Sequence, residues 1–329
     1  MYNGRGFAYT DNMRYADMHC DTLTVYPHLR HTEGQVSLER LRAAGAGVQC
    51  FAAFLPYVEG HLFERAQTFG DRLAAELAAN ADLAMPVRCA ADLEQAVLEG
   101  KVGAVFTVEE GGVLEGNLDN LAALYAKGMR MMTLTWNYPN ELGYPNCDAT
   151  LAERRGKEAL FRPEPRGLTP LGRQAVETMN DMGIVVDVSH LSDGGFWDVM
   201  ETSERPVVAS HSNARAVAGV SRNLDDEMIA ALAASGGVMG LNFCPDFLTL
   251  GDEDLLSAAL RHVRHIYDVG GEDVLALGTD FDGIQARAPL DDCMAVPLVH
   301  EAVARTLSPR VADKMAWTNF VRVFAEVCG

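Results

Sequence analysis

Short apolar runs alternate along the chain with longer segments in which apolar residues recur at helical spacing. Eight of these runs are predicted to be strands, because four to eight apolar or β-branched residues between turn residues are typical of buried strands. They cover residues 15–19, 48–55, 102–108, 131–135, 184–189, 206–210, 238–243 and 274–280. The alternation of strands with helical segments predicts repeated βα units around a parallel sheet.

Two of the intervening helices have clear ends. In "TPLGRQAVETMNDMG" Thr169 is the expected cap, Pro170 the first helical residue and Gly183 the stop. In "NLDDEMIAALAASGG" acidic residues occupy the first turn and Gly236 follows the last. Eight strands with helices between them predict a (β/α)8 TIM barrel, with a doubly wound open sheet as the alternative. Since no Pro- or Ser-rich linker and no short repeat divides the sequence, we expect residues 1–329 to form a single barrel domain.

The longest segment without a predicted element covers residues 136–167 and is rich in Pro, Asn, Gly and charged residues. Loops of this length are usually functional or disordered. Because it follows the fourth predicted strand, we expect it to lie over the mouth of the barrel as a lid.

Composition narrows the classes of function. The chain is 48% hydrophobic and 22% charged, which is typical of a folded soluble protein. Its 46 acidic and 27 basic residues give a formal charge of −19, so we expect no nucleic-acid or membrane partner. No apolar stretch is long enough to span a membrane, and the first residues lack the apolar region of a secretory signal. Seven widely spaced cysteines without a Cys-x-x-Cys pair disfavour disulfides and a thiolate zinc site, and they favour a cytoplasmic location.

Residues of types that can bind metals or transfer protons stand at the ends of five of the eight predicted strands, whose carboxyl ends would share one mouth in a barrel. These residues are His19, Asp21, Glu109, Glu110, His190, His211, Asp280 and Asp282. Each has an ordinary structural interpretation when taken alone, as a hydrogen-bonded core histidine, a turn residue or a helix cap. Together they would be costly to bury without partners, and a divalent cation is the simplest common partner.

The donor types indicate which ions fit. Imidazole and carboxylate without thiolate favour Zn²⁺ first, with Mn²⁺, Co²⁺ and Fe²⁺ as alternatives. Three histidines and two or three carboxylates are too many for one tetrahedral ion. They are about right for two ions that share a bridging carboxylate and a water, roughly 3.5–4 Å apart.

At this point the sequence resembles the membrane dipeptidase family, also called renal dipeptidases, a branch of the amidohydrolase-like metal barrels. The resemblance runs from "DMHCDTL" to "NFVRVFAEV", which is nearly the whole chain. It implies that His19 and Asp21 bind one zinc ion, that His190 and His211 bind the other, and that a glutamate bridges both.

Two glutamates compete for the bridging position, because this chain has "VEEGG" where the family usually has Val-Glu-Gly-Gly. Matching "KVGAVFTVE" and "NLDNLAALYAKGMR" to the family pattern without a gap assigns the bridge to Glu109. Glu110 would then point to the opposite side of the strand. The resemblance also places the catalytic aspartate at Asp280, and it places the arginine that binds the substrate carboxylate at Arg222.

The sequence departs from the family at two positions near the expected site. Where mammalian members have a histidine that polarises the scissile carbonyl, this chain has Trp136 followed by Asn137. We expect one of these two side chains to bind substrate in its place, unless the metal polarises the carbonyl alone or specificity has changed. Cys244 likewise stands where mammalian members tend to have tyrosine. These changes affect the substrate rather than the metal ligands.

The resemblance thus implies a dipeptidase in which two Zn²⁺ ions activate a bridging hydroxide and Asp280 carries the proton to the leaving amine. Arg222 would hold the free carboxylate of a small dipeptide, and the family likeness implies a homodimer. Two alternatives remain. One is hydrolysis of another amide at the same site, such as an N-acyl amino acid or a lactam. The other is a catalytically silent barrel that binds a small ligand.

Overall fold

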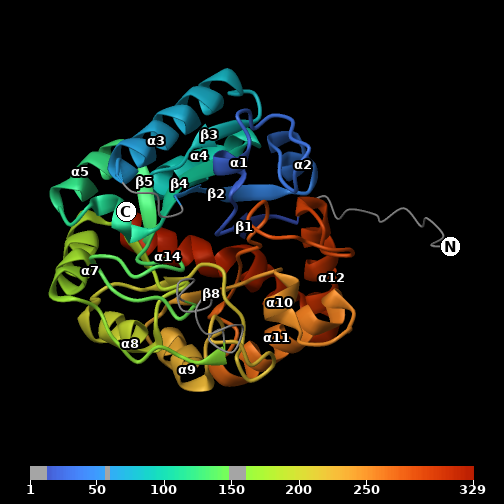
Figure 1. The fold of residues 1–329 in the computed structure, drawn as a ribbon. Coiled ribbons are helices and arrows are strands. Elements are labelled where there is room, and N and C mark those ends of the chain that lie inside the picture. The colour runs from blue at the N-terminus through green and yellow to red at the C-terminus, as the bar shows by residue number, and fades with distance from the viewer. Residues whose placement is uncertain (1–12, 56–59, 148–160) are drawn as a thin grey trace.

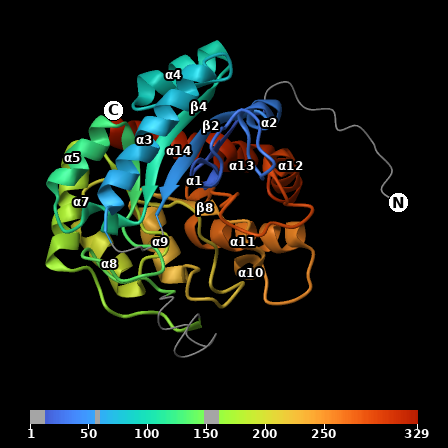
Figure 2. The ribbon, with the colours of Figure 1, turned by 45° about the horizontal axis from the view of Figure 1, so that its top comes forward.

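The computed structural model describes residues 13–55, 60–147 and 161–329, and its strands form a closed parallel barrel surrounded by helices (Figures 1 and 2). The strands are β1 (Tyr15–Asp17), β2 (Ala46–Phe54), β3 (Ala84–Pro86), β4 (Val102–Glu109), β5 (Met129–Thr133), β6 (Val185–Asp187), β7 (Val208–Ala209), β8 (Val238–Leu241) and β9 (Leu275–Leu277). Their order in the sheet is β2-β1-β9-β8-β7-β6-β5-β4, and β2 also pairs with β4, which closes the ring. The predicted (β/α)8 barrel is confirmed, and an open sheet is excluded.

All eight predicted strands are present, with boundaries that differ by a few residues at their ends. The additional strand, β3, pairs with the first residues of β4, in the register Ala84 to Val102. β5 pairs with the later residues of β4, from Phe106 to Glu109. With only three residues, β3 is too short to show a strand pattern in the sequence, and its pairing with β4 defines it.

Helices follow or connect the strands. They are α1 (Thr22–Val25), α2 (Leu38–Ala43), α3 (Leu62–Ala79), α4 (Ala90–Glu99), α5 (Asp119–Ala126), α7 (Pro170–Met182), α8 (Asp193–Thr202), α9 (Asp226–Ala234), α10 (Pro245–Leu248), α11 (Leu255–Gly270), α12 (Val296–Thr306), α13 (Pro309–Asp313) and α14 (Asn319–Cys328), with short helical turns η1 (Gly111–Leu114), η3 (Cys293–Ala295) and η4 (Lys314–Thr318). None of the helices within the described ranges is both long and apolar enough to cross a membrane.

The ends of α7 and α9 agree with the sequence. The hydroxyl of Thr169 accepts a hydrogen bond from the backbone N–H of Gly172 at 3.0 Å, and Gly183 ends α7 with a φ of 70°. The first turn of α9 is acidic, and its cap is Asp225. Gly236 follows α9 with a φ of 77°. Positive φ is a conformation that glycine adopts without a steric penalty, which is why these helices end there.

The interior of the barrel is apolar at its amino-terminal end and polar at its carboxyl end. Side chains such as Val48, Val105 and Val238 fill the interior and pack with Phe320 and Phe324 of α14. Figure 1 shows α14 crossing the barrel, and its Asn319 donates a hydrogen bond to the carbonyl oxygen of Leu275, the first residue of β9. Because α14 covers the amino-terminal end of the strands, the polar groups described below are confined to the opposite end.

The segment at 136–167 is described only at its two ends, since residues 148–160, which belong to the predicted lid, lie outside the described residues. Asn146 joins the two ends, because its amide oxygen accepts a hydrogen bond from the backbone N–H of Glu164 at 2.9 Å. The backbone N–H of Asn146 donates to the carbonyl oxygen of His190, and its side-chain N–H donates to that of Ser221. Both ends therefore lie against the loops that follow β6 and β7.

Candidate metal centre

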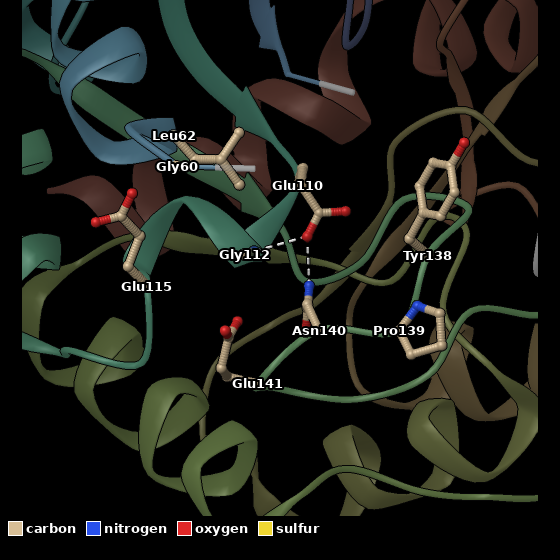
Figure 3. Close-up of a pocket in the computed structure, with 9 residues that line it drawn as sticks. All are labelled: Gly60, Leu62, Glu110, Gly112, Glu115, Tyr138, Pro139, Asn140 and Glu141. Atoms are coloured by element: carbon tan, nitrogen blue, oxygen red, sulfur yellow. Dashed lines mark hydrogen bonds between the residues drawn. The ribbon is translucent and has the colours of Figure 1, made fainter. Parts of the chain in front are cut away.

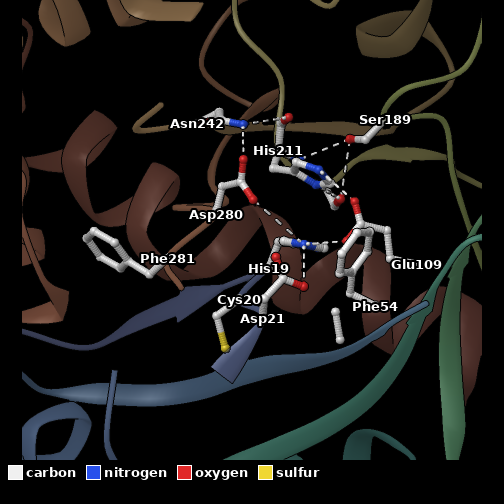
Figure 4. A network of polar contacts seen from close by, with 12 residues as sticks. His19, Cys20, Asp21, Phe54, Glu109, Ser189, His211, Asn242, Asp280 and Phe281 are labelled. Atoms are coloured by element: carbon white, nitrogen blue, oxygen red, sulfur yellow. Dashed lines mark hydrogen bonds and ion pairs between the residues drawn. The ribbon is translucent and has the colours of Figure 1, made fainter. Parts of the chain in front are cut away.

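Five of the side chains predicted to form the site converge at the carboxyl ends of the strands, and Figure 4 shows four of them, His19, Glu109, His211 and Asp280. His19 follows β1, Glu109 is the last residue of β4, His190 follows β6, His211 follows β7 and Asp280 follows β9. Each of them is at most 8% exposed. Parallel strands of a closed barrel bring their carboxyl ends to one mouth, so residues far apart in the sequence meet there.

Glu109 lies between two groups of histidines. Its Oε2 is 3.2 Å from Nε2 of His19, whereas its Oε1 is 3.1 Å from Nε2 of His190 and 3.6 Å from Nε2 of His211. The two oxygens of one carboxylate are thus divided between the two sets of imidazole ligands. Glu109 could therefore contribute one oxygen to each set of ligands.

His19 belongs to two overlapping groups of potential ligands. Its Nε2 is 3.8 Å from Oδ1 of Asp21 and 3.9 Å from Oδ1 of Asp280. The ligand atoms of His19, Asp21 and Asp280 all lie within 4.8 Å of one another, and so do those of His19, Glu109 and His211. His19 Nε2 and Asp21 Oδ1 are buried without a hydrogen-bond partner within the described part of the chain. Buried polar atoms without partners are costly, and a cation would satisfy both.

The tautomer of His211 is set by Ser210 and Asp187. The hydroxyl of Ser210 donates to Oδ2 of Asp187 at 2.5 Å, so its oxygen accepts the hydrogen on Nδ1 of His211 at 2.6 Å. Asp187 is fully buried and also accepts hydrogen bonds from the hydroxyl of Thr133 and the backbone N–H of Ser189. With Nδ1 protonated, Nε2 of His211 presents a lone pair to the site.

The tautomer of His190 is set in the same way by Asn137. The amide oxygen of Asn137 lies 2.9 Å from Nδ1 of His190, and because this oxygen can only accept, Nδ1 carries the hydrogen. The Nε2 atoms of His190 and His211 are 3.0 Å apart. Two lone pairs that face each other at this distance repel, whereas a cation between them and Glu109 would bind both. The residues therefore fit divalent metal ions with imidazole and carboxylate ligands.

Electrostatics in the site keeps two imidazoles neutral. Burial lowers the pKa of His190 to about 4, with a further contribution from the nearby charge of Arg222. Burial, together with the charges of His19 and Arg222, holds the pKa of His211 well below its ordinary value. For His19, burial acts in the same direction but is outweighed by Glu109 and Asp21, which raise its pKa. Neutral imidazole is the form that binds metal, so His190 and His211 are ready to act as ligands.

Asp280 is held at the edge of the cluster. Its Oδ2 accepts a hydrogen bond from the side-chain N–H of Asn242 at 2.9 Å, which leaves Oδ1 directed toward His19. Burial, opposed by the charge of His19 and supported by those of Asp21 and Glu109, raises the pKa of Asp280 to about 7. Asp280 has a φ of 65°, and His190 has one of 67°. Such backbone strain in non-glycine residues is concentrated at functional sites.

Arg222 is buried beside the histidines. It donates to the hydroxyl of Ser212 at 2.7 Å and to the carbonyl oxygen of His211 at 2.8 Å, and its Nε has no hydrogen-bond partner within the described ranges. Among the described residues no carboxylate lies within ion-pair distance of this guanidinium. Burial lowers its pKa, and the more distant charges, Asp280 first, oppose that shift. A buried cation without a counter-ion can bind an incoming carboxylate.

The two glutamates and the loop after β5 lie as follows. Glu109 faces the histidines, whereas the carboxylate of Glu110 accepts a hydrogen bond from the backbone N–H of Trp136 at 2.9 Å. The indole ring of Trp136 packs edge-on against Phe54 and lies 6.3 Å from the ring of His190. Trp136 and Asn137 are therefore both next to the cluster, and the amide oxygen of Asn137 is engaged with His190.

Sequence reasoning missed the residues that orient the ligands: Asp17, Asp187, Ser210 and Asn242. Asp17 accepts hydrogen bonds from the backbone and hydroxyl groups of Thr279 and from the backbone N–H of His19. A signal was available for two of them. Asp187 lies on a strand otherwise made of valines, and Ser210 directly precedes His211. A buried acid in an apolar strand requires partners, and those partners are the second layer of a metal site.

The fold and this centre define a metal-dependent hydrolase of the TIM-barrel class. Residues 8–328 match the family model described as membrane dipeptidase, peptidase family M19. The chain belongs to this family.

Individual relatives agree with this assignment. An uncharacterized protein in the pqqA 5′ region of Klebsiella pneumoniae is 34% identical over 246 residues, which cover 72% of this chain and 87% of that protein. A metallo peptidase from Rhodobacter sphaeroides, liganded with a phosphinate mimic of the dipeptide L-Ala-D-Ala, is 26% identical with a TM-score of 0.84, covering 96% of this chain and 100% of that one. The metallo peptidase called dipeptidase AC is also 26% identical, with a TM-score of 0.83, covering 96% and 99%.

Proposed function

We propose that this protein hydrolyses dipeptides that have a free C-terminal carboxylate. The reaction would use two divalent metal ions, with Zn²⁺ as the preferred ion. The observation that carries the proposal is the position of Glu109 between His19 on one side and His190 and His211 on the other. His19 and Asp21 would hold one ion, His190 and His211 the second, and Glu109 both. When bound, the ions would lower the pKa of water and polarise the peptide carbonyl.

The proton-transfer role is assigned to Asp280. A general acid–base group is most effective when its pKa is near the working pH, and burial raises that of Asp280 to about 7. Asn242 occupies one carboxylate oxygen and leaves the other facing the cluster. Asp280 would take the proton from the attacking water and pass it to the leaving amine.

Substrate orientation is assigned to Arg222, whose guanidinium is held by Ser212 and His211 without an ion-pair partner among the described residues, and which would bind the carboxylate of the dipeptide. The indole of Trp136 borders the cluster and would contact the substrate, whereas Asn137 would act mainly through His190. Because the Rhodobacter sphaeroides metallo peptidase was liganded with a mimic of L-Ala-D-Ala, we include a D-residue at the second position among the substrates to be tested.

The seven cysteines are all unpaired, which supports a reducing cytoplasm as the place of action.

The test is a substrate panel with the purified enzyme: L-Ala-D-Ala, L-Ala-L-Ala, the corresponding dipeptide amides, N-acetyl-alanine and a lactam. We expect at least one of the two free dipeptides to be cleaved. The amides should be cleaved poorly, because they lack the carboxylate that Arg222 would bind. Activity should be lost when a chelator removes the metal and restored by Zn²⁺. Hydrolysis of N-acetyl-alanine faster than any dipeptide would instead favour an acylase, and full activity of metal-free protein would exclude the mechanism.

A further inference from the structure

Glu110 has a backbone conformation that calls for an explanation. It follows the proposed bridging residue Glu109 directly, it is only 3% exposed, and its φ is 120°. A glycine adopts this φ freely, whereas a side chain rarely does. A strained residue persists when its side chain makes contacts that outweigh the strain.

Three N–H groups converge on the carboxylate of Glu110. Its Oε1 accepts from the backbone N–H of Gly112 at 2.7 Å and from the side chain of Asn140 (Figure 3). Its Oε2 accepts from the backbone N–H of Trp136 at 2.9 Å. A carboxylate can accept all three, whereas the amide of glutamine would direct N–H groups against at least one N–H donor. Two of the three donors belong to the loop after β5, residues 134–143, here called the β5 loop.

The β5 loop is packed closely against the turn after Glu110. A Cβ atom at Gly111 would lie 2.5 Å from the carbonyl oxygen of Leu134, so no larger residue fits there without movement. Asn140 extends the contact, because its side chain also donates to the carbonyl oxygen of Leu134 and accepts from the backbone N–H of Leu142. The carboxylate of Glu110 is therefore at the centre of the contacts that set the path of this loop.

The same loop reaches the metal centre. Asn137 lies between Trp136 and Asn140, and its amide oxygen accepts the hydrogen on Nδ1 of His190 at 2.9 Å. Displacement of the β5 loop would move this oxygen and release the ring of His190. A ligand that loses its orienting partner binds metal more weakly.

We propose that Glu110 is a positioning residue, which holds the β5 loop so that Asn137 fixes the orientation and tautomer of His190 in the metal centre. This inference rests on the metal-dependent function proposed above. Glu110 itself contacts neither metal nor substrate, and its effect on the centre passes through Trp136 and Asn137.

The experiment is a Zn²⁺ titration of the metal-free full-length protein in competition with a chromophoric chelator. The variants are Glu110→Gln, Glu110→Gly, Asn137→Leu and the double variant Glu110→Gln with Asn137→Leu. Glu141→Gln is the matched control, because Glu141 lines the same cavity of about 500 Å³ as Glu110 but is exposed. Thermal unfolding of each metal-free variant is recorded beside the titration.

We expect Glu110→Gln, Glu110→Gly and Asn137→Leu each to weaken one zinc-binding step by about 10- to 100-fold and to leave the other step unchanged. The double variant should bind no more weakly than the weaker single variant, because both substitutions break one chain of contacts. Glu110→Gly relieves the strained φ, so a stability at or above that of Glu110→Gln together with weak zinc binding would separate positioning from folding. Glu141→Gln should bind zinc as the wild type does.

Wild-type zinc affinity in both Glu110 variants, or losses that add in the double variant, would overturn the positioning role. These outcomes are distinct from failure of the proposed function. A wild-type protein that binds no Zn²⁺ would contradict the proposed function itself. If the wild type binds Zn²⁺ and the Glu110 variants bind it weakly, but no dipeptide is hydrolysed, the positioning role stands and the proposed substrate is wrong.

Discussion

The carboxylate of Asp280 is costly to bury and is also the group proposed to transfer the proton, and the substitution Asp280→Asn would separate these two properties. Its carboxylate is buried close to two others, Asp21 and Glu109, and we assign it the proton transfer. Asparagine has nearly the same shape, and its amide oxygen can still accept the hydrogen bond that Asn242 donates to Oδ2. It cannot ionise, however, and it cannot carry a proton from water to a leaving amine.

The expected change in the free energy of unfolding follows from the pKa of Asp280, which burial and its acidic neighbours raise from 3.8 to about 7. A carboxyl group whose pKa is raised by folding destabilises the protein as the pH rises between these two values, because the unfolded chain ionises first. Each pKa unit corresponds to about 1.36 kcal/mol, so the penalty in metal-free protein reaches about 4 kcal/mol above pH 7. Metal-free Asp280→Asn should therefore be more stable than the wild type by up to about 4 kcal/mol at pH 8 and equally stable near pH 4.

The same substitution should lower the activity although it raises the stability. General acid–base catalysis typically contributes about 10²- to 10⁴-fold to the rate, so we expect kcat of the zinc-loaded variant to fall by that factor. KM for a dipeptide should change little, because Arg222 is untouched. Greater stability with less activity is the expected result when a residue is retained for function at a cost to the fold.

The assay pairs urea unfolding of the metal-free proteins at pH 4 and pH 8 with steady-state hydrolysis at pH 8 after zinc loading. Asp252→Asn is the control, because it removes the same charge from an exposed position outside the site. If Asp280→Asn is no more stable than the wild type at pH 8, the carboxylate is not destabilised by its surroundings. If it retains the wild-type kcat, the proton is carried by another group.

Four further substitutions test other parts of the structure. Arg222→Met should raise KM for dipeptides about 10- to 100-fold, the value of a hydrogen bond to a charged group, and an unchanged KM would place the substrate carboxylate elsewhere. Ser210→Ala removes the acceptor for Nδ1 of His211 and should weaken zinc binding about 10- to 100-fold in a chelator competition; an unchanged affinity would contradict its orienting role. Burial lowers the pKa of His262 to about 4, so protonation favours the unfolded chain and stability should fall by about 3 kcal/mol from pH 6.5 to pH 4. That acid loss should be smaller in His262→Gln, measured by urea unfolding, and an identical loss would assign it to other groups. Phe324→Ala should destabilise the barrel by about 3–5 kcal/mol in the same assay, and a loss below 1 kcal/mol would show that α14 does not close the core.

The barrel could be predicted because its strands are buried apolar runs bounded by turn residues, and because the helix ends have sequence signals. The order of eight strands then placed all their carboxyl ends at one mouth, which is why His19 and His211 could be grouped although 191 residues lie between them in the chain. β3 could not be predicted in this way, since three residues do not define a period. Its position is set by pairing with β4.

The residues that orient the ligands were harder to predict, because their roles depend on contacts between strands. The sequence places Ser210 next to His211 but does not show that its hydroxyl also reaches Asp187, since Asp187 ends β6 whereas Ser210 and His211 follow β7, and the register of these strands is a tertiary property. Asn137 is a similar case. The path of the β5 loop, which the sequence does not reveal, brings its amide oxygen to His190.

Two glycines, which have no side chain, allow the strands around the centre to pack closely. A Cβ atom at Gly240 would lie 2.0 Å from the carbonyl oxygen of Ser210, and one at Gly278 would lie 1.7 Å from it. β8 and the end of β9 can therefore approach the end of β7 only because both positions are glycine, and this approach places Ser210 and then His211. A search for reactive side chains identifies His211 but passes over these glycines. The ligands can thus be predicted from their residue types, whereas their relative positions depend on close backbone packing that only the folded barrel reveals.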